Sequence, residues 1–318
     1  MNICLLALEG VFDTGLSVML DAFSTANELA GLQGLELPGF RVSLAGVRKT
    51  VKSAQGLKVP VGDLPEPANT DWVVLPAIGY KMPGPLLEAL KRKDVAEGTA
   101  VLREYARAGK QVGAACIGTF VLAESGLLDG QSATTSWWMS AFFRQRYPRV
   151  ALDESRMLVR SGNMLTAGAA LSHIELALWL IRQESPLLAD TTAKYLIVDS
   201  RPAQSAYIIS DHLQHSDPLV RGFEKWSRAN LDRGFSLDKA ASDLATSKRT
   251  LARRLQEVLG KSPLAYFQDL RVERAVHLLK TGDDDVESIA AQVGYADGAT
   301  LRTLLRRRLG HGVREIRR

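Results

Sequence analysis

The feature that most constrains this chain is an internal repeat with a period of 50 residues in its C-terminal third. Residues 248–259, KRTLARRLQEVL, are matched by residues 298–309, GATLRTLLRRRL. The same shift aligns apolar positions of the two copies: Ala240 with Ala290, Leu251 with Leu301, Leu255 with Leu305, and Leu259 with Leu309. Because self-similar segments fold as repeated supersecondary units, both copies are expected to adopt the same structure.

Each copy has the pattern of two helices joined by a tight turn. In the first copy a short helix is expected over residues 237–244, and Ser247 is a favourable N-cap for the helix that follows. In the second copy the short helix is expected over residues 286–293, followed by a turn at residues 294–297. Leucines at helical spacing give each second helix one buried face. This pattern is typical of a helix-turn-helix motif.

The outer faces of the two second helices carry cations, hydroxyls and an amide. The candidate DNA-binding residues are Arg249, Thr250, Arg253 and Gln256 in the first copy and Arg302, Thr303 and Arg306 in the second. Side chains of these types reach the phosphates and base edges of a DNA duplex. Basic residues on a single helix are usually only a solvated face, but their repetition favours a nucleic-acid interface.

A long helix is expected between the two copies. Ser262 is its predicted N-cap, Pro263 takes the first helical position, and Gly282 ends it. Apolar residues lie on two sides of this segment, which predicts a buried and rigid spacer. Such a spacer would let one chain read two successive major-groove segments about 34 Å apart.

Residues 219–318 resemble the DNA-binding domain of the AraC family of bacterial transcription regulators. The segments LARRLQEVLGKSPLAYFQDLRVERAVHLL and VESIAAQVGYADGATLRTLLRRRLG match the family pattern almost position by position. The chain departs from that pattern where Leu301 and Leu305 replace the usual phenylalanines, and where Gly298 and Ala299 occupy positions that often carry polar base readers. The second motif is therefore expected to anchor the DNA backbone more than to specify sequence.

The positive charge of the chain is concentrated in the same region. Residues 219–318 contain 20 Lys and Arg against 13 Asp and Glu, a net charge of +7. The rest of the chain contains 20 against 22, a net charge of −2. Such an excess suits a module that binds a polyanion. The length of 318 residues predicts that a further domain precedes it.

The preceding part of the chain alternates buried strands with helices. Strands are expected at residues 2–8, 40–46, 71–76, 111–115, 156–160 and 164–167, helices at 16–30, 85–90, 95–108 and 169–182, and an exposed hairpin over 48–63. This alternation predicts an open, mostly parallel α/β sheet with helices on both faces, ahead of the all-α tandem helix-turn-helix domain. Binding sites in such sheets lie at the carboxyl ends of the strands.

One strand end has the pattern of a nucleophile elbow. The strand ends at Ala115, the chain turns at Cys116, and a helix begins at once, with Gly118 small enough for the close approach. A thiol at a helix N-terminus is expected to have a lowered pKa. A cysteine hydrolase would also need a base. The one histidine before residue 200, His173, lies in an apolar helical pattern that favours a structural role.

Residues 1–183 resemble the PfpI-like branch of the class I glutamine amidotransferase-like fold. The resemblance implies a histidine directly after residues 131–135, but Ser136 stands there and Trp137 follows. The Cys–His pair is thus broken, and no catalytic residue is expected. Together the two resemblances imply the arrangement of GlxA-like members of the AraC family. The expected divisions are 1–185, a PfpI-like sensor domain; 186–217, a helix and linker; and 218–318, the AraC-type DNA-binding domain.

A small concave site is expected where the strand-end loops converge. The candidate ligand-binding residues are Asp13, Gly79, Tyr80, Cys116, Ile117, Ser136 and Trp137. The rings of Tyr80, Trp137 and Trp138 would suit a cationic or amine ligand through ring-face attraction. Family likeness implies a small-molecule effector derived from an amine or amino acid, and a homodimer formed through the N-terminal domain. The effector would then control DNA binding.

Cysteine and histidine usage predicts neither a metal site nor a cofactor. Cys4 and Cys116 are too few for a disulfide framework, and His212 and His215 lie in a linker-like segment. The first residues lack the pattern of a signal peptide, and no apolar run reaches the length of a membrane span. A cytoplasmic protein is therefore expected.

The sequence thus predicts a DNA-binding transcriptional regulator controlled by a small molecule, and not an enzyme. Two alternatives stay open. One is a cysteine-dependent hydrolase or glyoxalase-like enzyme that uses Cys116. The other is an architectural protein that binds double-stranded DNA without ligand control.

Overall fold

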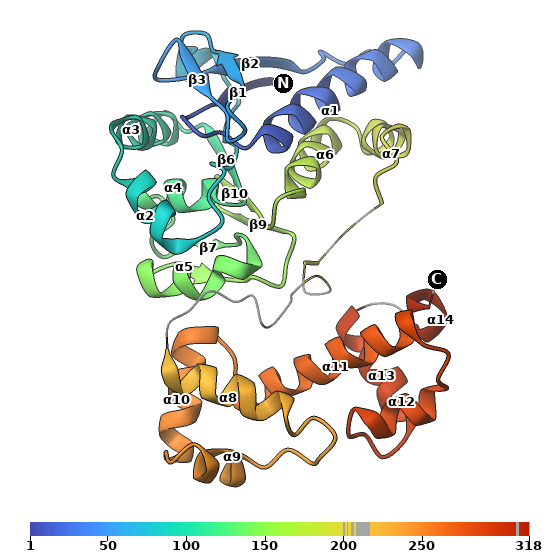
Figure 1. Ribbon diagram of the computed structural model, residues 1–318. Helices are drawn as coiled ribbons and strands as arrows, with labels where there is room; N and C mark the ends of the chain where they lie inside the picture. The colour runs from blue at the N-terminus through green and yellow to red at the C-terminus, as the bar shows by residue number, and fades with distance from the viewer. Residues whose placement is uncertain (200, 202, 205–206, 208–216, 310–311, 318) are drawn as a thin grey trace. The chain divides into compact units, whose positions relative to one another are not determined.

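The computed structural model of the protein describes residues 1–199, 201, 203–204, 207, 217–309 and 312–317. The chain divides into two units, Met1–Gln204 and Ser205–Arg318 (Figure 1). The three-part division expected from the sequence remains a prediction. The helix assigned there to the linker, α7 (Pro186–Tyr195), packs in the first unit against α1 (Asp13–Leu32) and α6 (Ser172–Glu184).

A six-stranded sheet forms the centre of the first unit, in the order β2-β1-β5-β6-β10-β9. These strands are β1 (Asn2–Leu6), β2 (Arg41–Ala45), β5 (Trp72–Leu75), β6 (Gln111–Ala115), β9 (Leu158–Ser161) and β10 (Met164–Ala167). Every neighbouring pair is parallel except β10 and β9, which are antiparallel. The predicted open, mostly parallel sheet is therefore confirmed.

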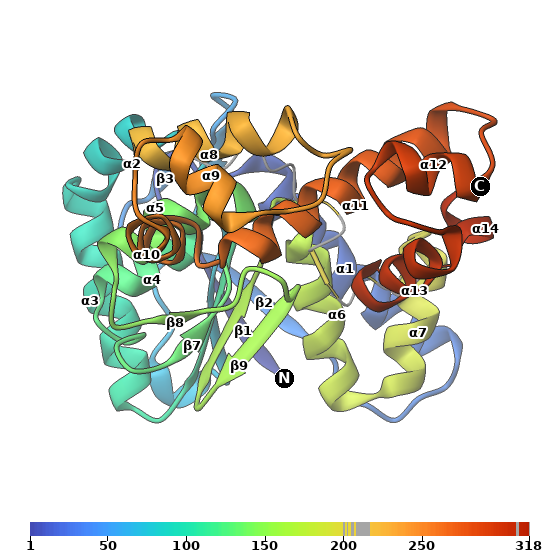
Figure 2. The ribbon, with the colours of Figure 1, turned by 90° about the horizontal axis from the view of Figure 1, so that it is seen from below.

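Helices cover both faces of this sheet (Figure 2). On one face α1, α6 and α7 pack over a core that includes Phe23. On the other face lie α2 (Pro83–Leu90), α3 (Lys93–Arg107), α4 (Gly118–Glu124) and α5 (Ser140–Arg146), over a core that includes Phe120. Successive strand residues point to opposite faces, so Val73 belongs to the second core and Val74 to the first.

Several short elements complete the first unit. β3 (Thr50–Lys52) and β4 (Lys58–Pro60) form the antiparallel hairpin predicted over residues 48–63. The elements β7 (Ser132–Ala133), β8 (Ala151–Leu152), η1 (Pro67–Asn69), η2 (Trp137–Met139) and α5 were not predicted. They are too short to show a clear hydrophobic period in the sequence.

Several predicted boundaries of the first unit need correction. The strand expected at residues 2–8 ends at Leu6, and the helix expected at residues 16–30 spans Asp13–Leu32. The strand expected at residues 156–160 begins at Leu158, because Arg156 instead forms an isolated antiparallel bridge with Ala203. The helix expected at residues 169–182 begins at Ser172. The later start of β9 arises from backbone pairing with a residue distant in sequence, near the end of the unit.

In the described part of the second unit, the secondary structure is helical, as predicted. The helices are α8 (Pro218–Arg228), α9 (Leu237–Asp243), α10 (Lys248–Leu259), α11 (Pro263–Thr281), α12 (Val286–Gln292), α13 (Gly298–Leu309) and α14 (Val313–Ile316). α9 and α10 form the first helix-turn-helix, α12 and α13 form the second, and α11 connects them (Figure 1). α8 and α14 were not predicted, and both pack against α11.

Local signals begin and end these helices where the sequence placed them. The Ser247 hydroxyl accepts a hydrogen bond of 3.0 Å from the backbone N–H of Thr250, which caps α10. Gly260 ends α10 in the left-handed conformation, with φ of +68°. The leucines aligned by the repeat are fully buried in both copies: Leu251, Leu255, Leu301 and Leu305.

A buried arginine fastens α11 to both motifs. The guanidinium of Arg271 donates to the carbonyl oxygens of Leu231, at 3.1 Å, and Arg233. It also lies over the rings of Phe267 and Tyr295, 4.8 and 5.0 Å from their centres. Leu231 and Arg233 precede the first motif, and Tyr295 lies in the turn of the second. Arg271 therefore links the two motifs through the spacer helix.

Candidate elbow site and nucleic-acid interface

The sharp turn predicted after β6 is present. Cys116 has φ of +56°, a left-handed conformation that residues other than glycine rarely adopt. A Cβ atom at Gly118 would lie 2.7 Å from the carbonyl oxygen of Leu75, so glycine is required where α4 begins. The combination of a strained cysteine and a helix that starts two residues later is the geometry of a nucleophile elbow.

The prediction of a lowered pKa for the Cys116 thiol is wrong. Burial raises this pKa to about 11, because the thiolate would lose its hydration. Only 4% of Cys116 is exposed. Its Sγ lies 2.9 Å from the Ser136 Oγ, at hydrogen-bonding distance, and this contact opposes the burial effect only in part. The thiol is therefore protonated at neutral pH and is a poor nucleophile.

His173 has the structural role that the sequence favoured. Its Nε2 accepts a hydrogen bond of 3.0 Å from the backbone N–H of Ala77, and its Nδ1 donates to the carbonyl oxygen of Ala170 at 2.6 Å. Burial lowers its pKa to about 4. Because backbone groups occupy both ring nitrogens, His173 cannot act as the base that Cys116 would need.

A depression of about 310 Å³ lies at the carboxyl edge of the sheet. It is lined by Glu9, Gly10, Lys52, Ser53, Ala54, Gly56, Gly79 and Tyr80. Two of the predicted ligand-binding residues, Gly79 and Tyr80, are among them. Asp13 contacts the lining of this depression, because its carboxylate accepts hydrogen bonds from the hydroxyl of the lining residue Ser53 and from the backbone N–H of Gln55.

The other predicted ligand-binding residues form a separate buried group. Cys116 and Ser136 contact each other, and Ile117 and Trp137 are 1% and 8% exposed. Trp137 packs edge-on against Trp138, with ring centres 5.5 Å apart. The structure thus brings the seven candidates together as two clusters, one open at the depression and one closed around the elbow.

The ring face of Tyr80 already has a cation. The guanidinium of Arg92 lies 5.9 Å from the ring centre and donates to the Tyr80 hydroxyl at 3.0 Å. The same side chain donates to the carbonyl oxygen of Glu9 and forms an ion pair of 3.0 Å with Asp94. One face of the Tyr80 ring is therefore already occupied by a cation of the protein.

The sequence did not identify the hairpin residues that line the depression. The hairpin is held over the strand ends by two backbone hydrogen bonds, from Gly10 to Lys52 at 2.7 Å and from Ala54 to Val11 at 2.9 Å. Its exposed position in the sequence pattern gave no indication of this contact. A larger depression of about 420 Å³, which Arg103 and Asn163 help to line, lies at the amino ends of β6 and β10, away from the elbow.

The candidate DNA-binding residues of the first motif lie on the free face of α10. Arg249, Arg253 and Gln256 are exposed, and Thr250 is half-buried. The Arg253 guanidinium forms an ion pair of 2.7 Å with Glu257, one turn further along the helix. The Thr250 hydroxyl accepts from Ser247 at the cap. The exposed face therefore presents two guanidinium groups and one amide.

In the second motif an acidic residue closes the start of the recognition helix. Arg302, Thr303 and Arg306 are exposed on α13, as expected. The Glu287 carboxylate accepts a hydrogen bond of 2.6 Å from the backbone N–H of Gly298 and lies 3.4 Å from Arg302. A Cβ atom at residue 298 would lie 2.5 Å from that carboxylate. Glycine at this position therefore makes room for the carboxylate.

Neither metal ligands nor membrane spans stand out in the described residues. No three His, Cys, Asp or Glu side chains of that part of the chain gather where they could hold a metal ion. His212 and His215 lie outside the described residues. Among the helices that the structure describes, none combines the length and apolar character of a membrane span.

Taken together, these features define a class of two-unit proteins. An α/β unit whose elbow has no base among the described residues is joined to a helical unit with two basic helix-turn-helix motifs. Family models match both parts: the DJ-1/PfpI family over residues 1–183, and a helix-turn-helix domain over residues 240–318. The chain belongs to the DJ-1/PfpI family, and its C-terminal part is the helix-turn-helix domain of AraC-type regulators.

Relatives of this chain are named as transcriptional regulators. The HTH-type transcriptional regulator GbdR of Pseudomonas aeruginosa is 29% identical over 212 residues, which is 65% of this chain but only 57% of GbdR. The HTH-type transcriptional regulator GlxA of Rhizobium meliloti is 23% identical over 92% of this chain and 88% of its own length. The crystal structure of an AraC family transcriptional regulator from Pseudomonas putida has a TM-score of 0.51 at 21% identity, over 61% of this chain and 98% of that chain, and so shares the fold.

Proposed function

We propose that this protein is a sequence-specific, DNA-binding transcriptional regulator whose α/β unit senses a small molecule. The observation that carries the proposal is the repeated motif, in which α10 and α13 each expose a basic face on either side of the stiff helix α11. Two such helices on one rigid spacer can enter successive major-groove segments. The names of the relatives GbdR and GlxA support the same function.

The two motifs are proposed to divide the work. Arg249 and Arg253 of α10 read base edges, supported by Thr250 and Gln256, because a guanidinium can donate two hydrogen bonds to guanine. Helix α13 is proposed to contact chiefly the sugar-phosphate backbone of the DNA. Its cations, Arg302 and Arg306 with Thr303, suit phosphate contacts, and its N-terminus is already occupied by Glu287.

The α/β unit is proposed to bind its effector without turnover. The thiol of Cys116 has a raised pKa, and both ring nitrogens of His173 are held by backbone groups. In the described part of the chain the elbow therefore has no activated nucleophile. The open depression beside Asp13, Gly79 and Tyr80 gives the effector a polar entry. An amine or amino-acid-derived metabolite remains the proposed effector class. A homodimer formed through this unit, in the cytoplasm, completes the proposal.

The experiment is selection of bound duplexes from a random pool by the full chain, followed by footprinting. The proposal requires one enriched sequence with two protected patches about one helical turn apart. Binding that depends on salt but not on sequence would instead identify an architectural protein. No enrichment and no protection would overturn the assignment.

The enzyme alternative has its own test, because the strained turn at Cys116 is retained. Cys116→Ala should leave the affinity for the selected duplex unchanged. The wild-type protein and this variant are then assayed with ester and 2-oxoaldehyde substrates. Turnover that the wild type supports and Cys116→Ala abolishes would replace the sensor proposal with a hydrolase or glyoxalase-like enzyme.

A further inference from the structure

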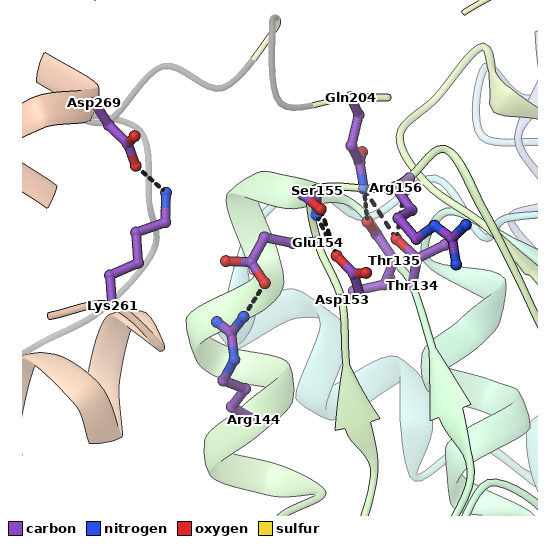
Figure 3. Close-up of polar contacts among 10 residues, drawn as sticks. All are labelled: Thr134, Thr135, Arg144, Asp153, Glu154, Ser155, Arg156, Gln204, Lys261 and Asp269. Atoms are coloured by element: carbon purple, nitrogen blue, oxygen red, sulfur yellow. Dashed lines mark hydrogen bonds and ion pairs between the residues drawn. The ribbon is translucent and has the colours of Figure 1, made fainter. Parts of the chain in front are cut away.

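Gln204 is the last residue of the α/β unit, and its polar side chain is buried, with only 1% exposed. Buried amides are costly unless each polar atom has a partner. The side chain points into the unit, toward the segment that leads from β7 to η2 (Figure 3). A residue at the very end of a unit thus has an environment typical of a core.

The amide of Gln204 is fully used. Its Nε2 donates to the carbonyl oxygen of Thr135 at 2.9 Å and to the Thr134 hydroxyl at 3.0 Å, with a longer contact of 3.3 Å to the carbonyl oxygen of Arg156. Its Oε1 accepts from the backbone N–H of Ala169 at 3.0 Å. These bonds join the end of the unit to three separate loops.

Close packing fixes the position of the Gln204 side chain. A Cβ atom at Gly168 would lie 2.6 Å from the amide carbon of Gln204, so glycine there makes room for the side chain. The backbone N–H of Gln204 donates to the carbonyl oxygen of Ser155 at 2.9 Å, and Ala203 forms a bridge with Arg156. Side chain and backbone therefore fix Gln204 together.

The segment that Gln204 holds is the one that closes on the elbow. The Thr135 hydroxyl donates to the carbonyl oxygen of Cys116 at 2.7 Å. Ser136 follows, with its Oγ 2.9 Å from the Cys116 Sγ. Thr134, Thr135 and Ser136 are each 0% exposed. Two hydrogen bonds of Thr135, one at its carbonyl oxygen and one at its hydroxyl, thus connect Gln204 to Cys116 inside a buried network, where such bonds reinforce one another.

We propose that Gln204 is a positioning residue that couples the elbow to the start of the chain leading into the DNA-binding unit. A ligand that displaces the Thr134–Ser136 segment must also displace the amide of Gln204, and release of Gln204 must loosen that segment. This inference rests on the proposed function of the α/β unit as a sensor. It deepens that function by naming the residue that links the buried elbow, rather than the open depression, to the end of the α/β unit.

A second anchor beside it provides a matched control. Arg201 donates to the Glu175 carboxylate at 2.9 Å and to the carbonyl oxygen of Leu171 at 3.4 Å, both at the start of α6. Arg201 therefore also fastens the end of the unit, but none of these contacts involves the segment around Ser136. Arg201→Ala loosens the chain end without touching the elbow, whereas Gln204→Ala does both.

The test measures how fast dithiobis(nitrobenzoate) labels each cysteine of the full-length protein, with the labelled peptides separated by mass spectrometry. Both Cys4 and Cys116 are buried and free, so Cys4 reports global opening. Gln204→Ala should raise the labelling rate of Cys116 about tenfold relative to Cys4. This is the change expected from losing the one hydrogen bond, to the carbonyl oxygen of Thr135, that lies on the path to Cys116. Arg201→Ala should leave the ratio of the two rates unchanged.

A second test measures the effect of the elbow on the chain that follows Gln204. Its readout is the rate of chymotrypsin cleavage after Tyr207, which is 54% exposed and three residues beyond Gln204. Ser136→Ala should raise the cleavage rate several-fold, and the same change in a Gln204→Ala background should have a smaller effect, since coupled residues are not additive. Equal acceleration of both cysteines, an unchanged Cys116 rate in Gln204→Ala, or full additivity in the cleavage test would overturn the coupling. These readouts need no DNA, so the absence of a selected duplex would contradict the proposed function alone.

Discussion

The two units place their polar groups in opposite ways. In the α/β unit, Cys116, Ser136 and His173 are buried, bonded to neighbours and neutral at physiological pH. On the recognition helices of the second unit, Arg249 and Arg306 are exposed to solvent. Buried groups that satisfy one another give specificity to a closed site, while exposed cations attract a polyanion over a distance.

This difference separates the kinds of ligand that each unit can bind. A buried network can respond to a molecule only if part of it opens, so binding there is linked to a conformational change. An exposed basic helix needs no such opening before it meets DNA. This difference agrees with the proposed roles, in which the α/β unit senses a small molecule and the exposed helices contact DNA. Two residues of the second unit depart from this difference, the buried Arg271 and the exposed Glu287, and substitutions of them test it.

Substitution of Arg271, the buried arginine of α11, should have the largest effect on stability. Arg271→Ala leaves the carbonyl oxygens of Leu231 and Arg233 without this donor and removes two ring contacts. The free energy of unfolding of the second unit should fall by about 4 kcal/mol. Urea denaturation followed by circular dichroism measures it. Arg274→Ala, at an exposed position one turn along the same helix, is the control and should change it by less than about 0.5 kcal/mol.

Burial of His173 should make the stability of the first unit depend on pH. Its pKa is about 4 in the folded protein against an ordinary value of 6.5, so the unfolded chain binds the proton more tightly. The stability that this lowered pKa contributes is complete above pH 6.5 and is lost as pH falls toward 4, by about 3 kcal/mol in total. Urea titrations at several pH values, in a Trp226→Phe background that leaves tryptophan only in the first unit, measure this loss.

The control for that measurement is His173→Gln, which cannot take up a proton in this range. Its stability should fall less steeply between pH 6.5 and 4 than that of the parent. Equal slopes for the two proteins would show that His173 does not govern the acid sensitivity of the α/β unit. Other carboxylates titrate in both proteins, so the difference between the slopes isolates the histidine.

The sequence predicted those features whose causes are local. The cap at Ser247, the end of α11 at Gly282 and the turn at Cys116 each depend on a few neighbouring residues, and all three are present. The direction of the Cys116 pKa was wrong because it depends on burial by a segment 20 residues away. The contact of Gln204 with Thr134 spans 70 residues and had no signal in the pattern. Long-range packing, rather than propensity, decides such features.

Arg253 tests the division of work between the two recognition helices. Arg253→Ala should weaken binding to the selected duplex by about 1 to 3 kcal/mol and relax the preference at one base position. Arg302→Ala should weaken all duplexes alike and lower the salt slope by about one unit. Binding isotherms on the selected duplex and on single-base variants distinguish the two. If Arg253→Ala weakens every duplex equally, that arginine contacts phosphate and α10 is not the reader.

The smallest effect is expected at Glu287, the carboxylate that closes the start of α13. Glu287→Gln keeps an acceptor for the backbone N–H of Gly298 but removes a negative charge from the positive end of the helix, where a phosphate could bind. Affinity for a non-selected duplex should rise by about 0.3 to 1 kcal/mol at low salt, and this gain should shrink as salt is added. Asp283→Asn makes the same charge change at an exposed position that precedes α12 and should raise affinity less. Equal gains from the two variants would show that only net charge matters, and that the carboxylate at the helix start does not weaken the second motif.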